Sequence, residues 1–288
     1  MRFGFVVPFG DARSVADRAV AAEAAGWDAI FDWEAIWGDD AWVSLTAAAM
    51  VTDRIRIGTL LSPLPRMKPW DLASRVSSLD RLSGGRVQLC VGLGACHPGW
   101  TAFEPDEGRA KRAQLLDEGL AIYAGLMHGQ PFEYDGRHYH VRPTDFMLPD
   151  PPAQQPHPPV WVVGAARIGP DGAERTPSLV RAARWEGLLP CVIGETGPGE
   201  TATPDSLAKL VARTGEVRAE AGLPWEGYDV IVEGRSHGEG RTDPGDPAVW
   251  AEAGGTWWVE GAWDLKPTPQ GRRELDRRIA AGPPSLCP

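Results

Sequence analysis

Glycines at the ends of two apolar segments are the first residues in this chain whose placement suggests chemistry. Residues 58 to 94 read as a buried strand, a Pro-rich loop, an amphipathic helix and a second buried strand that ends in Gly92-Leu93-Gly94. Gly92 and Gly94 carry no side chain, so a ligand could approach the backbone N–H groups there. The alternative is that this Gly-Leu-Gly only turns the chain into a loop.

A second group of residues has the composition of an anion site. Gly164 ends another apolar run and is followed by Arg167, Arg175 and Thr176. Thr176 suits a helix N-cap, and Pro177 suits the first helical position. Free N–H groups at that helix start, together with the two arginines, could hold a phosphate group. The alternative is an ordinary capped surface helix with solvated arginines.

Other kinds of site have weaker support. His138 and His140 alternate on a predicted hairpin, but two histidines without a third ligand do not predict a metal site. Motifs of nucleophilic hydrolases and of triphosphate-binding loops are absent. A pair of acidic residues at strand ends could serve a glycosidase, yet nothing in the sequence selects that chemistry.

The elements that must position these residues alternate regularly along the chain. We expect helices over 15–25, 42–51, 70–82, 109–127, 179–184, 207–221, 248–253 and 271–281. We expect strands over 3–7, 29–31, 55–60, 87–91, 160–163, 187–192, 228–232 and 256–259. Eight strands alternating with eight helices predict an α/β fold, a closed (β/α)8 TIM barrel.

One segment interrupts this alternation before the fifth strand. Residues 129–159 combine a period-two pattern around Asp135-Gly136, which is a hairpin signal, with a Pro-dense extended run. We interpret this segment as an insertion packed on the barrel, and residues 1–288 as one barrel domain.

Composition limits the partners. The chain has 288 residues and a net charge of −10, which argues against nucleic acid and against an anionic membrane surface. A small-molecule substrate fits better. The four cysteines form no Cys-x-x-Cys pair, and no stretch approaches a transmembrane length, so we expect a cytoplasmic protein with reduced thiols.

Several segments, in order, resemble the bacterial luciferase-like family of flavin- and F420-dependent oxidoreductases. They are Thr59-Leu60-Leu61-Ser62-Pro63, the run 79–86 (Leu-Asp-Arg-Leu-Ser-Gly-Gly-Arg) with Gly92-Leu93-Gly94, 116–120, the hairpin 132–139, 159–164 and 181–187. The resemblance covers roughly residues 1 to 190. It implies the same barrel, with the flat ring of a flavin-type cofactor at the C-terminal ends of the strands.

The resemblance also implies roles for individual residues. The end of the third strand, Thr59, Leu60 and Leu61, would bulge against one face of the ring, although the two leucines could equally be barrel core. Where many relatives have an aromatic-Asp-His sequence, this chain has Trp33-Glu34-Ala35. Glu34 is therefore the leading candidate for an acid/base or polarising group, with a solvated loop acid as the alternative. His97, in the loop after the fourth strand, is a second candidate and could equally be a surface residue.

The resemblance leaves the cofactor and the reaction open. Reduced FMN with oxygen would insert one oxygen atom into the substrate, whereas coenzyme F420 would support only hydride transfer. We favour FMN slightly, with F420 as the alternative, and Ala35 also allows a non-catalytic flavin-binding relative. The many tryptophans suggest a pocket for an apolar or aromatic substrate, although Trp27 and Trp161 are better explained as core. A flavin reductase that supplies reduced cofactor and a second copy of the chain are possible partners.

Overall fold

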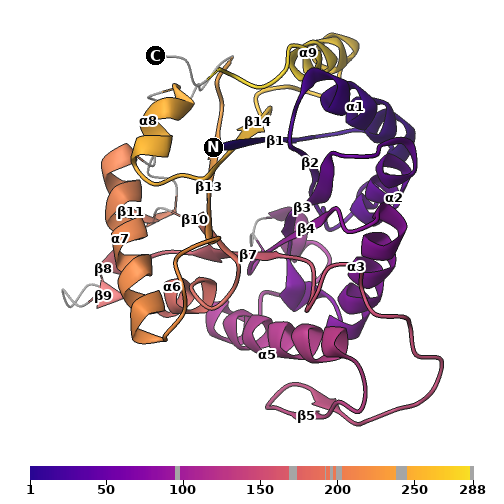
Figure 1. The fold of residues 1–288 in the computed structure, drawn as a ribbon, viewed down its shortest axis with the longest axis vertical. Coiled ribbons are helices and arrows are strands. Elements are labelled where there is room, and N and C mark those ends of the chain that lie inside the picture. The colour runs from indigo at the N-terminus through magenta and orange to yellow at the C-terminus, as the bar shows by residue number, and fades with distance from the viewer. Residues whose placement is uncertain are drawn as a thin grey trace.

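Eight parallel strands close into a barrel in the computed structural model of the chain. The structure describes residues 1–94, 98–168, 174–191, 193–194, 197–198, 203–237 and 245–285. The barrel order is β1-β14-β13-β10-β7-β4-β3-β2, so the two ends of the chain close the sheet by pairing β1 with β14. The predicted TIM barrel is confirmed (Figure 1). The strands span Arg2–Val6 (β1), Ala29–Asp32 (β2), Arg56–Ser62 (β3), Val87–Val91 (β4), Val160–Gly164 (β7), Gly187–Pro190 (β10), Asp229–Gly234 (β13) and Trp257–Gly261 (β14).

Helices surround the barrel as an outer layer (Figure 1). They begin and end within a few residues of the predicted positions, because Gly, Pro and capping residues mark their ends. They are Ala12–Ala25 (α1), Ala41–Val51 (α2), Pro69–Ser83 (α3), Arg109–His128 (α5), Pro177–Ala182 (α6), Pro204–Glu220 (α7), Pro247–Glu252 (α8) and Pro269–Ala280 (α9). Two short helical segments, Leu64–Arg66 (η1) and Pro98–Thr101 (α4), lie in the loops after β3 and β4.

Aromatic side chains fill the middle of the barrel. Phe31, Trp161 and Trp257 are fully buried, with the Trp161 ring 5.6 Å from Phe31 and 5.1 Å from Trp257. Trp27 is also buried, between the barrel and its helices, so both tryptophans that we predicted as core lie there. Because these side chains fill the barrel, its interior is a packed core. A ligand would therefore bind at the ends of the strands.

The predicted insertion leaves the barrel after α5. It contains the antiparallel pair Tyr134–Asp135 (β5) and His140–Val141 (β6), which confirms the hairpin signal. Figure 1 shows the hairpin outside the helical layer, beyond α5. Three backbone N–H groups, those of residues 137 to 139, donate to the carboxylate of Glu118 on α5, which fixes the hairpin to that helix.

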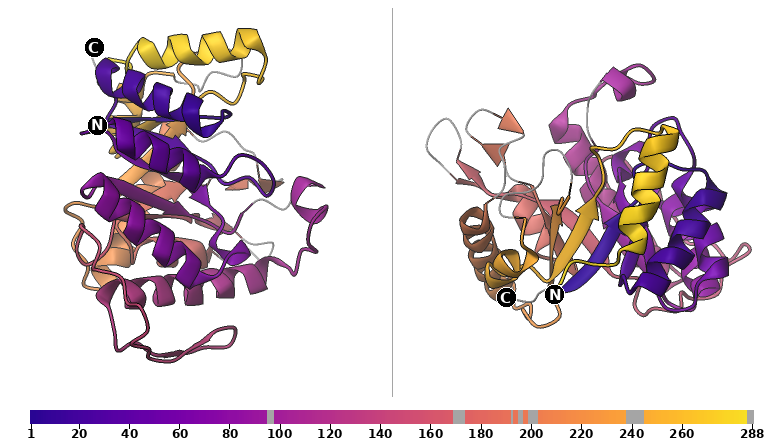
Figure 2. Two further views of the ribbon diagram at one scale, coloured as in Figure 1. Left: turned by 90° about the vertical axis from the view of Figure 1, so that its right-hand side faces the viewer. Right: turned by 90° about the horizontal axis from the view of Figure 1, so that it is seen from above.

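The C-terminal ends of the strands lie at one end of the barrel, opposite the N-terminus. Figure 2 shows α4 and the small sheet of Arg167–Ile168 (β8) and Glu174–Arg175 (β9) at this end. A second small sheet pairs Ile193–Gly194 (β11) with Gly197–Pro198 (β12). In the part of the chain that is described, no helix combines the length and hydropathy needed to cross a membrane.

Candidate functional site

The third strand carries an irregularity where we expected one. Its register against β4 shifts between Thr59 and Ser62, and the peptide bond between Leu60 and Leu61 is cis. Leu60 is buried in the barrel interior, whereas Leu61 keeps part of its surface open to solvent. A bulge of this kind redirects side chains at a barrel rim. Leu61 is thereby presented at the mouth of the barrel, and Leu60 belongs to the core.

Gly92 and Gly94 both lie in tight packing within the protein. A Cβ atom on Gly92 would lie 3.0 Å from Val163 and 3.2 Å from Leu61. Gly94 has a φ of +74°, and its Cβ would lie 2.1 Å from the ring of Trp100. Gly92 therefore makes room for the leucine of the bulge, and Gly94 turns the chain beneath Trp100. Their approach to a cofactor stays a prediction.

Glu34 is bonded to the bulge. Its Oε1 accepts hydrogen bonds from the Trp42 indole at 2.9 Å and from the Ser62 hydroxyl. The Ser62 hydroxyl lies 2.9 Å from that of Thr59, so Glu34, Ser62 and Thr59 form a continuous polar chain. Burial raises the pKa of Glu34, while the bonds from Ser62 and Trp42 oppose that change. Glu34 thus links the loop after β2 to the end of β3.

Asp32, at the C-terminal end of β2, is a second carboxyl group in this region. It was not predicted as a site residue from the sequence. It is the last residue of β2, and its Oδ1 accepts the N–H of Trp33 at 2.8 Å. Burial raises the pKa of Asp32 to about 6. A carboxyl group that titrates near neutrality is able to exchange protons under working conditions.

Glu233 is a third carboxylate, and it lies across the barrel. Ile231 faces the barrel interior, so the alternation of a strand directs Glu233 inward as well, at the C-terminal end of β13. Its side chain is exposed at the mouth, and its Oε1 accepts the indole N–H of Trp263 at 2.5 Å. Partial desolvation raises the pKa of Glu233. Nothing in the local sequence points to this residue, because its position depends on closure of the barrel.

Two tryptophans line the same side of the mouth. Trp33 and Trp263 keep 36% and 43% of their surface exposed, and their ring centres lie 5.8 Å apart in an edge-to-face arrangement. By contrast, Trp257 and Trp258 are fully buried and belong to the packing of β14. Trp33 follows β2 and Trp263 follows β14, so both have the exposure and position of pocket-wall residues.

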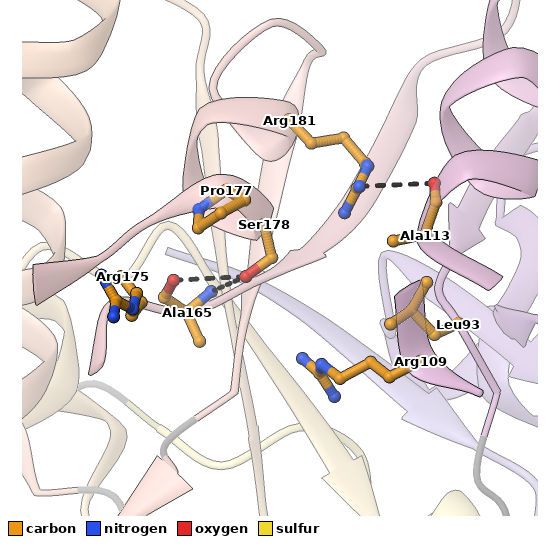
Figure 3. A pocket seen from close by; sticks show the side chains of 8 residues that line it. All are labelled: Leu93, Arg109, Ala113, Ala165, Arg175, Pro177, Ser178 and Arg181. Atoms are coloured by element: carbon orange, nitrogen blue, oxygen red, sulfur yellow. Dashed lines mark hydrogen bonds between the residues drawn. The ribbon is translucent and has the colours of Figure 1, made fainter. Parts of the chain in front are cut away.

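A cavity of about 90 Å³ lies beside the mouth, between α5 and the start of α6. Figure 3 shows Arg109 extending from α5 toward Ala165 and Arg175, with Ser178 and Arg181 on the α6 side. Arg181 is held by the carboxylate of Asp117, at 2.5 and 2.9 Å. Three arginines and a serine around a space of this size are suited to an anion.

The residues predicted for the anion site belong to segments next to this cavity, and one of them lines it. Arg175 lines it, and Thr176 occupies the N-cap position of α6 with Pro177 at the first helical position, as expected, although the Thr176 hydroxyl makes no capping bond. The backbone of Arg167 pairs with that of Arg175 in the β8–β9 ladder. Gly164 packs β7 against α6, since a Cβ there would lie 2.6 Å from Leu188 and 3.0 Å from Ala182.

Arg109 and Arg181 also line the cavity between α5 and α6, and they were not predicted from the sequence. Arg181 stands in one of the segments that carry the family resemblance, and Arg109 begins a helix that we predicted. Their positions at the start of one helix and the end of another were visible in the sequence. What the sequence does not show is that α5 and α6 lie side by side.

Of the remaining candidates, those within the described residues contribute little to the geometry. His97 lies outside the described residues. The carbonyl of Ala35 accepts a hydrogen bond from Arg66 at 3.1 Å, so this position binds through its backbone. The His138 ring bonds Gln114, whereas His140 bonds Asp135.

A second cavity, of about 550 Å³, lies between η1, the start of α3, α5 and the hairpin. Its charged groups have both signs: Arg66, Lys68 and Lys111 face it together with Asp71 and Glu107. Lys111 is paired with Glu107 at 2.5 Å. This cavity lies outside the barrel mouth and offers no single recognition chemistry.

Comparison with known proteins agrees with the geometry. The profile of the family described as luciferase-like monooxygenase matches residues 1–180. Among curated relatives, an uncharacterized protein from Mycobacterium bovis and one from Mycobacterium tuberculosis are each 35% identical over 199 residues, which is 66% of this chain. The match spans 59% of the length of these relatives.

Solved structures share the fold at low sequence identity. A coenzyme F420-dependent tetrahydromethanopterin reductase from Methanopyrus kandleri superposes with a TM-score of 0.72 at 17% identity, over 98% of each chain. The oxygenating constituent of 3,6-diketocamphane monooxygenase from Pseudomonas putida, in complex with FMN, gives a TM-score of 0.64 at 20% identity. That match covers 82% of this chain and 67% of the other.

Proposed function

The chain belongs to the luciferase-like monooxygenase family, and we propose that it is a flavin-dependent oxidoreductase whose cofactor lies at the C-terminal mouth of the barrel. The observation that carries this proposal is the bulge that presents Leu61 at the mouth, next to a cavity lined by arginines. A flavin-type cofactor needs both features: an apolar support for one face of the ring and a cationic site for its phosphate.

The residues at the mouth fit such a group. Leu61 would support the ring, while Gly92 leaves the space that this leucine requires. Arg109, Arg175 and Ser178 would hold the phosphate, and Asp117 holds Arg181 in place beside them. Gly94, Gly164, Arg167 and Thr176 complete the proposed cofactor site through their backbone or through their position beside the cavity.

We assign FMN as the cofactor, with F420 as the alternative, since solved structures of this fold include a protein in complex with FMN and one dependent on F420. The bound cofactor supplies two-electron transfer, or oxygen activation when it is reduced FMN. Glu34 fixes the end of β3 through Ser62 and is placed to exchange a proton at its second oxygen, with His97 as a further candidate for proton transfer. The substrate is a small organic molecule with an apolar or aromatic part.

Titration with the two cofactors tests the proposal directly. Purified protein should change the absorption or fluorescence of FMN, or of F420, at micromolar concentrations. If neither cofactor binds, the proposed function is wrong. Binding without turnover of candidate substrates would favour a flavin-binding protein without activity, which the alanine at position 35 allows.

The phosphate assignment has its own test, because riboflavin is FMN without the phosphate group. We expect FMN to bind at least about tenfold more tightly than riboflavin, a difference of roughly 1.4 kcal/mol. The double variant Arg109→Gln/Arg175→Gln should bind the two nearly equally. Arg137→Gln, an exposed arginine on the hairpin, is the matched control and should keep the preference. A preference that survives in the double variant would contradict the assignment.

We also propose that the protein is a homodimer and that a separate reductase supplies reduced flavin. Val43, Met50 and Val51 on α2 are 60%, 66% and 51% exposed. Apolar side chains grouped on one helix at this exposure are typical of an interface. The reductase is part of this proposal because reduced flavin must be supplied to a monooxygenase that uses it with oxygen.

A further inference from the structure

Glu233 lies on the opposite side of the barrel from the proposed ring support. In the closed order of strands, β13 is four strands from β3 in either direction. A flat ring whose one face rests on Leu61 would therefore turn its other face toward β13. That face is the one from which a substrate must approach. Glu233 is thus placed on the substrate side of the mouth.

The carboxylate of Glu233 has a neutral partner. Its Oε1 accepts the N–H of Trp263, and within the described residues Oε2 has no hydrogen-bond partner. Partial desolvation raises the pKa of Glu233 overall, while the Trp263 N–H and the charge of Arg235 oppose that change. An indole N–H satisfies one oxygen without cancelling the negative charge. The charge of the carboxylate is therefore left for a ligand at the mouth.

Two indole rings are held beside this carboxylate. The N–H of Trp33 donates to the carbonyl of Pro8 at 3.1 Å, and that of Trp263 donates to Glu233, so both rings have a fixed orientation. Gly261 makes the arrangement possible, because a Cβ there would lie 2.9 Å from the Trp263 ring and 3.2 Å from the Glu233 carboxylate. The site is therefore shaped by several residues at the ends of β2, β13 and β14.

Exposed aromatic rings next to a carboxylate prefer to bind organic cations. The negative face of an indole attracts an organic cation, and the attraction grows when the cation is partly desolvated. A carboxylate adds a charge-assisted hydrogen bond if the cation carries an N–H group. A neutral apolar ligand would use the rings alone and would leave the carboxylate of Glu233 desolvated without compensation.

We propose that the barrel mouth selects a substrate that carries a protonated amine, bound by Glu233 beside the exposed rings of Trp33 and Trp263. This inference rests on the proposed function, since it takes the substrate side of the mouth from the placement of the cofactor on Leu61. It narrows the substrate class from small organic molecules to organic cations with an apolar or aromatic body.

Benzylamine and benzyl alcohol are suitable probes, because at pH 7.5 they differ mainly in charge. Calorimetric titration of the protein, with and without FMN, gives both dissociation constants. We expect benzylamine to bind at least about tenfold more tightly than benzyl alcohol. Equal affinities for the two probes would overturn the inference.

The variant Glu233→Gln keeps the side-chain volume and can still accept the Trp263 N–H. We expect its preference for benzylamine to fall below about threefold, in line with loss of one charge pair. Glu226→Gln, an exposed acid at a distance, is the matched control and should keep the wild-type preference. A Glu233→Gln protein that keeps the full preference would overturn the inference. Trp263→Phe, which keeps a ring and removes the N–H, should reduce the preference and provides a second variant if the first fails to fold.

The cofactor titration on the same samples separates this inference from the proposed function. Flavin binding without a preference for the amine would refute only the substrate class. Absence of flavin binding would refute the proposed function, whatever the probes show.

Discussion

The burial of Asp32 makes the stability of the folded protein depend on pH. The group is ionised in an unfolded chain above about pH 4, whereas burial raises its pKa in the folded protein to about 6. The folded state therefore binds an extra proton between these two values. The contribution of Asp32 to stability is fully present below about pH 4 and is lost as the pH rises through 6.

We expect Asp32→Asn to remove this dependence. Relative to the variant, the wild-type protein should lose roughly 3 kcal/mol of unfolding free energy between pH 4 and pH 7, from a shift of about two pKa units at 1.36 kcal/mol each. Urea denaturation of both proteins across this range measures the difference. A constant difference at every pH would show that Asp32 titrates normally in the folded protein.

Single residues also show where sequence reasoning reached its limit. Glu34 could be proposed because a carboxylate stands in a segment that resembles a family motif. Its bonds to Ser62 and Trp42 could not, because they depend on the bulge in β3. Glu233 and Asp32 were missed for the same reason: an acid near a strand end becomes informative only when closure of the barrel decides which side chains face the mouth and which are buried.

At the scale of elements, the Leu-Ser-Gly-Gly-Arg run at 82–86, part of the family resemblance, has a structural role. Gly84 ends α3 in the left-handed conformation, with a φ of +67°. Arg86 then donates to the carbonyls of Ala49, Thr52 and Ile55 at 2.9 to 3.0 Å, which ties the start of β4 to the end of α2. The helix and strand positions were predictable because such end signals are local. The bulge lies where β3 pairs with β4, and was expected only from the family resemblance.

Packing between β4, β7 and the bulge leads to a prediction for Gly92. Gly92→Ala would place a methyl group 3.0 Å from Val163 and 3.2 Å from Leu61, so Leu61 must shift. We expect the affinity for flavin to fall at least about fivefold, with a loss of stability of roughly 1 to 3 kcal/mol for overpacking. Cofactor titration and urea denaturation measure the two effects.

Gly215→Ala is the matched control for this substitution. Gly215 lies in α7, and apart from its chain neighbours and the helix's own backbone no atom lies within 4 Å of the position of its Cβ. Alanine there should stabilise the helix by roughly 0.5 to 1 kcal/mol and leave flavin affinity unchanged. If Gly92→Ala binds flavin as tightly as Gly215→Ala, Leu61 does not support the ring.

At the scale of the whole molecule, the barrel could be predicted from the alternation of strands and helices alone. Each of the eight predicted strands overlaps a barrel strand. The last hundred residues, which carry no family motif, show the same alternation of strands and helices. Closure through β1 and β14 is what brings Trp33, Trp263 and Glu233 together from distant parts of the sequence. The single-domain organisation of residues 1–288 follows as a proposal from this closure, because the first and last strands are neighbours.

The outer face of α2 leads to a prediction about assembly. This helix is apolar on both sides: Leu45 and Ala48 are fully buried against the barrel, while Met50 is 66% exposed. A helix with two apolar faces is stable when both are covered. We therefore expect a homodimer through this face, and we expect Met50→Glu to shift it toward monomer by placing a charge in the apolar contact.

Sedimentation equilibrium of the wild-type protein and of Met50→Glu measures this directly. Glu220→Gln, an exposed position at the end of α7 on another side of the barrel, is a control that should leave the mass unchanged. Flavin affinity per chain should be the same in monomer and dimer, because Leu61, Arg109 and Arg175 come from one barrel. A wild-type protein that is monomeric at high micromolar concentration would contradict the prediction, and the exposed face of α2 would then need another explanation.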